Sequence, residues 1–292
     1  MLDSSDNLAL FTATVFSLLA FYRVILKLPT IPKARESRVL SLPDLSFDGE
    51  VAGELLDVFQ TEGLSSSVCS RASGSVNLDF FGAKESAEGL VSFYLGDVSG
   101  KGLAASLCQA TCVSTLQLAA SISLDPVGIV SEVNETLCRR GGKERFATLV
   151  YGTLEISSGR LRLLSAGHPN PIKISKNSQA KVMECAPCLP VGISSEHKYA
   201  LTEHYLQPGD SLLLYSDGVT EARDSRRDFL GECGLLKLAE RHHCGLPGFM
   251  VESVLDQVQE FSPTRKDDQT LMILHYSGVR SEYATNSLLQ AV

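Results

Sequence analysis

Residues 95–102, LGDVSGKG, place an aspartate, Asp97, between an apolar segment and the start of an apolar helical pattern. The preceding Leu90–Leu95 segment has the short apolar run of a strand, and Leu103–Ala120 carries apolar side chains at helical spacing. Glycines lie close to Asp97 on both sides, and glycine lets a backbone or a ligand approach closely because it has no Cβ atom. Asp97 is therefore predicted to stand at a rigid strand end with space for a ligand beside it.

The segments around this stretch follow an order of strands, two helices, strands and then late helices. Upstream, the residue types predict a short helix at Val51–Gln60 and a strand at Ser75–Phe81. Downstream, the expected helices are Pro126–Cys138, Leu235–His242 and Phe249–Phe261, and the expected strands are Phe146–Glu155, Arg160–Ser165, Ser211–Tyr215 and Leu271–His275. This order predicts the α+β class with mostly antiparallel strands and does not fit a regular βαβ alternation.

Acidic residues recur next to the predicted strands. Asp79 lies in the block NLDFFG, Asp217 follows the apolar run SLLLY by two residues, and Asp267 and Asp268 precede the last strand. Carboxylates that converge on one point repel one another strongly unless protons or cations neutralise them. Hard oxygen ligands of this kind suit Mg²⁺ or Mn²⁺. Any one of these aspartates alone fits a helix cap or a turn better, so only the whole set indicates a metal site.

Five blocks, in this order along the chain, resemble the PPM-type (protein phosphatase 2C-like) serine/threonine phosphatases, in their bacterial SpoIIE/RsbU-like branch. The resemblance extends over roughly residues 45–276. The blocks are GDVSGKGLAA at 96–105, FATLVYGTL at 146–154, SAGHPNP at 165–171, GDSLLLYSDGVTEA at 209–222 and DDQTL at 267–271.

The resemblance implies an α-β-β-α sandwich, in which two antiparallel sheets lie between layers of helices, with two Mn²⁺ or Mg²⁺ ions at one edge. By matching position, Asp97 bridges both metals, the carbonyl group of Val98 completes the second site, and Asp217 and Asp267 hold the first metal. Asp79 lies 18 residues before Asp97, a spacing that the family shares, and orients a water on the second metal. A water activated by the two metals then attacks the phosphorus of a phosphoserine or phosphothreonine.

The chain departs from the family pattern around the first aspartate. The family usually has Gly-Gly-Asp followed by an aromatic pair and a second Asp, where this chain has NLDFFG at 77–82. Ser99 stands where animal-type relatives carry a histidine that is a candidate general acid. No arginine is clearly assigned to the phosphate, and Arg71 and Lys101 are the candidates that the sequence offers. His168 fits either a turn residue that bonds nearby groups or a catalytic residue.

The composition is that of a folded protein, with 44% hydrophobic and 21% charged residues. The net charge is −8, and no patch rich in lysine or arginine stands out in the body of the chain. Nucleic-acid binding is therefore disfavoured.

The function expected from these observations is hydrolysis of phosphoserine or phosphothreonine on a regulatory protein, with an anti-sigma antagonist as the substrate that the family suggests. Two alternatives stay open. One is a degenerate phosphatase fold that acts as a binding or scaffold protein, which the altered block around Asp79 favours weakly. The other is a phosphohydrolase that acts on a small molecule. Retention of the aspartates at the matching positions favours the protein phosphatase.

Three regions are expected along the chain. Residues 1–40 hold an apolar helix and a linker, residues 41–276 form the phosphatase domain, and residues 277–292 form a tail. The segment Leu8–Leu28 carries no acidic residue, and its first 15 residues, Leu8–Tyr22, carry no charge at all. Those 15 residues span about 22 Å as a helix, whereas a hydrocarbon core of about 30 Å needs roughly 20 residues.

The shortfall closes if Arg23 and Lys27 extend toward the lipid head groups. Basic residues follow the segment and acidic residues precede it, which places the catalytic domain in the cytoplasm by the positive-inside rule. The alternative is a helix that packs on the domain or on a second copy of the chain, giving a homodimer.

We expect full-length protein to sediment with membranes and to resist a high-salt wash, because the apolar segment 8–28 anchors it. The fragment 41–292 should be soluble. Subcellular fractionation of both forms is the measurement. Full-length protein that stays soluble and monodisperse without detergent would show instead that the helix is a packing or dimerisation element.

Overall fold

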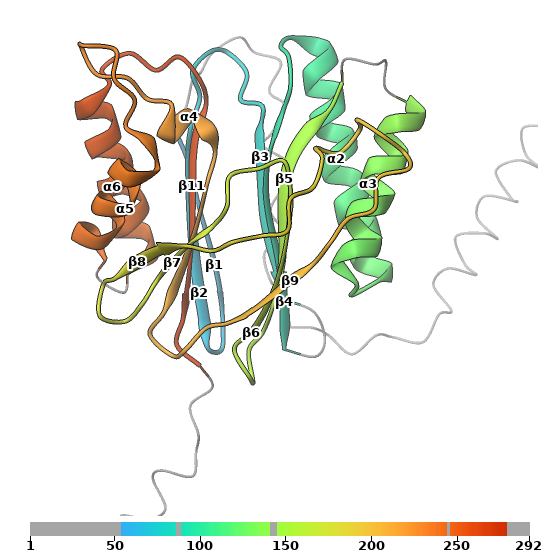
Figure 1. Ribbon diagram of the computed structural model, residues 1–292, viewed down its shortest axis with the longest axis horizontal. Coiled ribbons are helices and arrows are strands. Elements are labelled where there is room, and N and C mark those ends of the chain that lie inside the picture. The colour runs from blue at the N-terminus through green and yellow to red at the C-terminus, as the bar shows by residue number, and fades with distance from the viewer. Residues whose placement is uncertain (1–53, 86–88, 141–144, 244–245, 279–292) are drawn as a thin grey trace, which may run out of the picture. The chain divides into compact units, whose positions relative to one another are not determined.

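The computed structural model describes residues 54–85, 89–140, 145–243 and 246–278. They form two antiparallel sheets that lie face to face between two pairs of helices (Figure 1). The predicted α+β class and the α-β-β-α sandwich are both confirmed. The apolar segment 8–28 and the tail after residue 278 lie outside the described residues, so the membrane anchor stays a prediction.

The first sheet, sheet A, has six strands and the second, sheet B, has five. In spatial order, sheet A contains β1 (Glu54–Thr61), β2 (Leu64–Arg71), β11 (Gln269–Tyr276), β10 (Ser211–Tyr215), β7 (Ile172–Ile174) and β8 (Ala180–Val182). Sheet B contains β3 (Asp79–Glu85), β4 (Leu90–Val98), β5 (Ala147–Glu155), β6 (Arg160–Ala166) and β9 (Thr202–Tyr205). All neighbouring strands of both sheets pair antiparallel.

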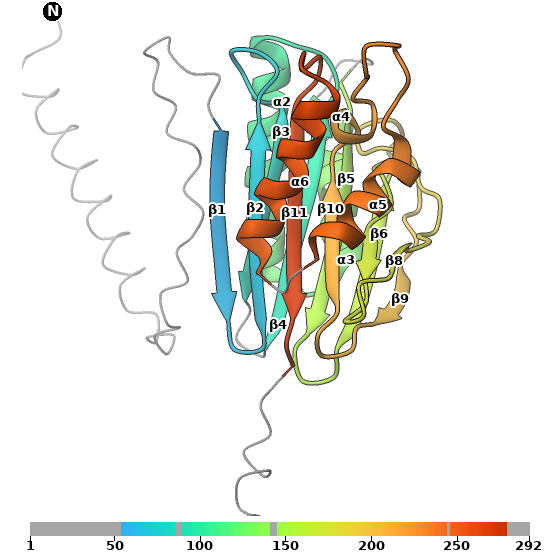
Figure 2. The same cartoon turned by 90° about the vertical axis from the view of Figure 1, so that its left-hand side faces the viewer.

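Helices cover the outer face of each sheet. α2 (Leu103–Ile122) and α3 (Pro126–Arg140) pack on sheet B, and α5 (Gly231–His242) and α6 (Pro247–Phe261) pack on sheet A, in front of it in Figure 2. The short helix α4 (Asp217–Thr220) follows β10 directly. Among the described residues, α2 alone is long and apolar enough to cross a membrane by length and composition. It packs on α3 and on sheet B through Ala105, Cys108, Cys112 and Leu116.

Three separate apolar cores hold the four layers together. Successive side chains of a strand point to opposite faces, so each strand contributes to two cores at once. In β4, Phe93 and Leu95 lie in the core between the two sheets, whereas Val98 lies in the core under α2 and α3. In β10, Leu212 and Leu214 lie between the sheets, and their neighbours on the other face pack under α5 and α6. This alternation decides on which face each polar side chain at the strand ends lies.

Two of the predicted elements are wrong. The part of the expected helix Val51–Gln60 that the structure describes lies in strand β1, which pairs with β2 from Glu54↔Arg71 to Thr61↔Leu64. Gly63, at a φ of 81°, lets residues 62–63 turn the chain back on itself. The stabilisation from pairing with β2 therefore outweighs the helical spacing of the apolar residues. The expected strand Ser75–Phe81 begins only at Asp79, because residues before it form a loop that is bonded to a distant carboxylate described below.

Gly96 offers a test of how tightly sheet B is packed. A Cβ atom at this position would overlap the ring of Phe80 and lie 2.5 Å from the carbonyl oxygen of Thr148 on the neighbouring strand. We expect Gly96→Ala to lower the free energy of unfolding by about 1–3 kcal/mol or more. Gly74→Ala is the matched control, since nothing lies within 4 Å of its added atom, and it should change stability by less than about 0.5 kcal/mol. Urea unfolding measures both, and equal stability of the two variants would contradict this packing.

Candidate active site

Two aspartates of sheet B lie directly opposite each other at the edge of the sandwich. Asp79 is the first residue of β3 and Asp97 the last but one of β4, and the two are paired in the antiparallel register. Asp97 shares its face of the strand with Phe93 and Leu95, so it lies on the side that faces sheet A. Asp79 is buried and Asp97 is half-buried. The structure therefore brings together the two residues that were predicted to be catalytic.

Sheet A supplies the other two predicted ligands from the ends of adjacent strands. Asp217 begins α4 two residues after β10, and Asp267 lies two residues before β11, which pairs with β10 through Tyr215↔Leu271. Gly218 packs against the chain before β11, since an added Cβ atom would collide with the Asp268 carbonyl group and lie 3.2 Å from Cβ of Asp267. The glycine of the SDG block thus lets the chain that carries Asp217 approach the segment that carries Asp267.

The electrostatics show that these carboxylates act on one another. Burial raises the pKa of Asp97 to about 7, and the negative charges of Asp217, Asp267 and Asp268 add to the shift. Burial also raises the pKa of Asp79, with the charge of Asp97 acting in the same direction and a hydrogen bond from Thr270 opposing it. The pKa of Asp217 is raised as well, first by its partial burial, and that of Asp267 is raised by partial loss of hydration at the rim and by the charges of Asp217 and Asp268. Ionising each of these carboxylates therefore costs free energy, and a cation close by would remove that cost.

Protein cations do not supply that charge within the described ranges. Their ion pairs leave out Asp79, Asp97, Asp217 and Asp267 altogether. In the same residues, no three His, Cys, Asp or Glu side chains come as close together as the ligands of one ion. The carboxylates therefore lie within electrostatic reach without converging on one point. Their donor chemistry, all hard oxygen and without a partner cation, fits Mg²⁺ or Mn²⁺.

A chain of hydrogen bonds fixes the Asp79 carboxylate from the opposite sheet. The Thr270 hydroxyl donates to Oδ2 of Asp79 at 2.5 Å and lies 2.6 Å from the Ser70 hydroxyl, which receives a bond from the Asn77 amide at 2.7 Å. Because each hydroxyl has one proton, Ser70 donates to Thr270, and the whole chain runs from Asn77 to Asp79. On the helix side, Gln109 of α2 donates to the Asp79 carbonyl oxygen at 2.8 Å. The sequence interpretation missed Thr270, Ser70 and Gln109, and the only signal was the Thr270 position in the DDQTL block.

The two aspartates of the DDQTL block have different positions. Asp267 is exposed at the rim, whereas Asp268 is buried and accepts hydrogen bonds of 2.7 Å from the backbone amides of Ser73 and Leu78. Asp268 therefore holds the loop that leads into Asp79, and this is the reason that β3 starts late. Val98 lies next to Asp97 at the end of β4, with its side chain in the core under α2 and α3.

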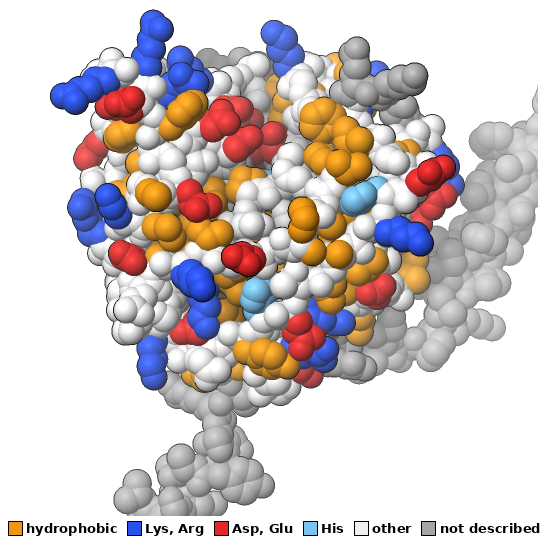
Figure 3. Space-filling view, in the orientation of Figure 1, with side chains coloured by type: hydrophobic (Ala, Val, Ile, Leu, Met, Phe, Trp, Pro, Cys, Tyr) orange, Lys and Arg blue, Asp and Glu red, His pale blue; other side chains and the backbone are white. Residues whose placement is uncertain are grey.

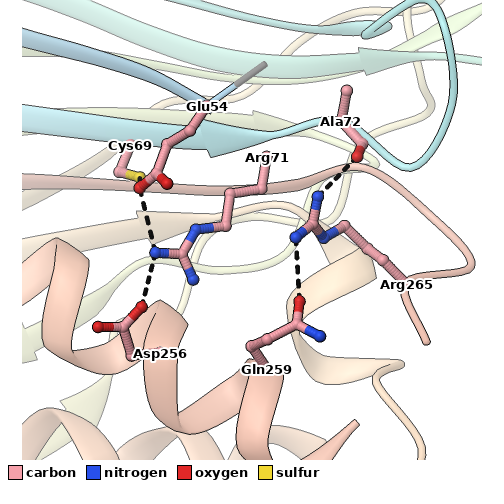
Figure 4. Close-up of polar contacts among 7 residues, drawn as sticks. All are labelled: Glu54, Cys69, Arg71, Ala72, Asp256, Gln259 and Arg265. Carbon is pink, nitrogen blue, oxygen red and sulfur yellow. Dashed lines mark hydrogen bonds and ion pairs between the residues drawn. The ribbon is translucent and has the colours of Figure 1, made fainter. Parts of the chain in front are cut away.

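Arg71 was the wrong candidate for a phosphate-binding residue. Its position in β2 puts it on the face toward α6, away from the space between the sheets. There it pairs with Glu54 at 3.1 Å and with Asp256 of α6 at 2.7 Å, and its side chain is 9% exposed (Figure 4). Arg265 beside it donates to the Ala72 carbonyl oxygen at 2.7 Å. Lys101 is exposed in the turn before α2 and is not part of any ion pair among the described residues.

His168 is buried behind the site. Its Nδ1 atom lies 2.9 Å from the Thr148 hydroxyl, and its carbonyl oxygen accepts a hydrogen bond from Ser165 at 2.7 Å. Burial lowers the pKa of the ring to about 3, so the imidazole is neutral at neutral pH. These contacts favour the interpretation of His168 as a turn residue.

Comparison with known families agrees with this geometry. Residues 87–277, which include β4 through β11, match the family described as Stage II sporulation protein E (SpoIIE). This match takes in more than half of the chain. The protein belongs to the SpoIIE family. Asp97, Asp217 and Asp267 lie inside the matched SpoIIE region, whereas Asp79 lies before it, so its place in the site depends on its register with Asp97.

Individual SpoIIE relatives support the same fold. The chain is 28% identical over 185 residues to phosphoserine phosphatase RsbU of Bacillus subtilis, across 63% of this chain and 55% of RsbU. The solved RsbU and RsbW domains of Rv1364c from Mycobacterium tuberculosis superpose with a TM-score of 0.66 at 21% identity, over 81% of this chain and 65% of that one. The phosphatase domain of Bacillus subtilis SpoIIE with a fragment of its regulatory domain gives a TM-score of 0.63 at 18% identity, over 78% of this chain and 71% of that one. The chain therefore spans about half the length of RsbU.

Asp268 and Asp267 should differ in what they contribute to the stability of the fold. We expect Asp268→Asn to lower the free energy of unfolding by about 1.5–3 kcal/mol, because an amide offers one oxygen where the carboxylate accepts two backbone bonds. Asp267→Asn removes an exposed, mutually repelling charge and should leave stability unchanged or slightly raised. Chemical unfolding of both variants without added metal is the measurement. A larger loss in Asp267→Asn than in Asp268→Asn would contradict these roles.

Proposed function

We propose that this protein is a metal-dependent protein serine/threonine phosphatase that removes phosphate from a phosphorylated regulatory protein. The observation that carries the proposal is the group of four aspartates, Asp79, Asp97, Asp217 and Asp267, which two separate sheets bring to one edge. Their pKa values are raised by burial and by one another, which is the environment of a polyvalent cation site.

In this proposal the chain's own groups hold two divalent ions. Asp97 is paired with Asp79 on its own sheet and is affected by the charges of Asp217 and Asp267 from the other sheet, and by the family resemblance it would contribute to both ions. The Val98 carbonyl group would complete the second site. When bound, Mn²⁺ or Mg²⁺ supplies an activated water as nucleophile and neutralises charge on the phosphoryl oxygens. Thr270 holds the Asp79 carboxylate in one orientation, in which it would orient a water.

Named relatives support the phosphatase activity and the use of metal ions in this proposal. RsbU is a phosphoserine phosphatase. RsbX was crystallised with magnesium and superposes with a TM-score of 0.60, and the catalytic domain of the serine/threonine phosphatase PstP contains two manganese ions and superposes at 0.55. By the resemblance to the SpoIIE/RsbU-like branch we propose an anti-sigma antagonist, phosphorylated on serine or threonine, as the substrate. The catalytic domain would then act in the cytoplasm.

Full-length protein should hydrolyse p-nitrophenyl phosphate and a phosphoserine peptide only with Mn²⁺ or Mg²⁺, and excess chelator should abolish turnover. Asp97→Asn should lower kcat by about 100-fold or more, because it removes the shared ligand. Its thermal unfolding without metal should be unchanged or shifted upward, since one of the repelling charges is gone. Asp57→Asn, on the outer strand β1, is the matched control and should keep full activity.

Each contrary result indicates a different conclusion. Full activity in excess chelator would contradict the metal-dependent mechanism. A folded protein that is inactive with either metal would favour the scaffold alternative. Faster hydrolysis of nucleotides than of phosphopeptides would favour a small-molecule phosphohydrolase.

A further inference from the structure

A polar cleft opens beside the aspartates. It has a volume of about 340 Å³, at the small end of ligand sites, and Asp267 and Gly218 form the wall that it shares with the aspartate group. The rest of the cleft is built by the loop after α4 and by the segment between α6 and β11. A group that lies in this cleft would therefore be close to a phosphate held beside Asp267.

Three cations line this cleft: Arg223, Arg227 and Lys266. All three are exposed, and none takes part in an ion pair among the described residues. Figure 3 shows Lys and Arg side chains gathered at the upper left corner, next to acidic side chains.

The acidic residues of the cleft, Glu221, Asp224 and Asp267, match these cations in number, but two of them already have other partners. The Oδ1 atom of Asp224 accepts the backbone amides of Arg226 and Asp228, at 2.8 and 2.9 Å, so its carboxylate is already bonded within the loop. Asp267 faces the other aspartates of the site. Glu221 is the remaining carboxylate on the wall. None of these carboxylates forms an ion pair with the three cations among the described residues, so the cationic groups are open to an incoming anion.

The loop that carries the two arginines has a fixed conformation. Arg223 and Phe229 form a short antiparallel bridge, and the Arg223 guanidinium lies 3.9 Å from the centre of the Phe229 ring. At the tip, Arg227 has a φ of 72°, which is unfavourable for a residue with a side chain, and its backbone amide bonds to the Asp224 carbonyl oxygen at 3.0 Å. Glycine would relieve this strain, so Arg227 occupies this turn at a cost in stability.

We infer that this cleft binds an anionic side chain that flanks the phosphorylated residue, so that acidic phosphoprotein segments are the preferred substrates. The anion is the carboxylate of Asp or Glu, or a second phosphate, within two or three residues of the scissile group. Residues in an extended chain advance about 3.3–3.6 Å each, so a neighbour at that spacing reaches an adjoining cleft. This inference rests on the proposed phosphatase function and specifies its substrate class.

The experiment measures kcat/KM of full-length protein with Mn²⁺ on matched phosphoserine peptides. One peptide has glutamates at the flanking positions, the second has glutamines, and the third has a second phosphoserine. We expect kcat/KM for the glutamate peptide to exceed that for the glutamine peptide by about five- to tenfold, mainly through KM. The preference should shrink in high salt because the cations are exposed. The third peptide offers a second phosphate as the anion, and its kcat/KM should likewise exceed that of the glutamine peptide.

Variants assign the preference to the cleft. Arg227→Gln should reduce it by about threefold, Arg227→Lys should retain most of it, and Arg227→Gln combined with Lys266→Gln should abolish it. Arg227→Gly removes the same charge and favours the observed turn, so it should lose the preference without losing stability. Arg226→Gln is the matched control, since Arg226 is in the same loop but does not line the cleft, and it should keep the preference.

Two results would overturn the inference: equal kcat/KM on the glutamate and glutamine peptides, or an equal loss of preference in Arg226→Gln and Arg227→Gln. The second would show a general effect of surface charge. Failure of the proposed function looks different, because wild-type protein would then hydrolyse neither p-nitrophenyl phosphate nor the glutamine peptide with Mn²⁺.

Discussion

The repulsion among carboxylates at one edge of the sandwich is the constraint on which the site depends. Asp79 and Asp97 are opposite each other across two hydrogen-bonded strands, and like charges in that position destabilise a sheet. Asp217 and Asp267 add charge from the other sheet. Strands anchored in three apolar cores supply the stability that keeps these groups in place. The rigid cores thus hold a site whose own electrostatics oppose its assembly.

The alternation of side chains along each strand places the polar groups of the site on the face between the two sheets. Within β3 and β4 the face toward sheet A carries Asp79 and Asp97, and within β11 the corresponding face carries Thr270. A shift of one residue in any of these strands would send the polar group into a helix-covered core. Arg71 illustrates the other outcome, since its place in β2 commits it to Asp256 on α6. Arg71 therefore stabilises the fold through its ion pairs and does not take part in the site.

The loops at this edge differ in how they are held. The loop before β3 is tied to Asp268 by two backbone amides, which makes the position of Asp79 depend on the residue next to a proposed metal ligand. The loop after α4 is closed by its own Asp224 and by the contact between Arg223 and Phe229. One loop therefore positions a group for chemistry, while the other presents cations to whatever lies beside the phosphate.

The sequence by itself determined the fold class, the strands β4, β5, β6, β10 and β11, the long helices and the four aspartates that lie at the edge. It could do so because long periodic segments and ordered blocks such as those around Asp97 and Asp217 are local features of the chain. It did not determine β1, because the pairing of Glu54–Thr61 with β2 outweighs a helical spacing that is also local. The tertiary structure alone decided that Asp268 holds a loop, that Thr270 fixes Asp79, and that Arg227 and Lys266 line one cleft beside Asp267. Each of these depends on contacts between segments far apart in the chain, which strand register and packing create and which no local pattern encodes.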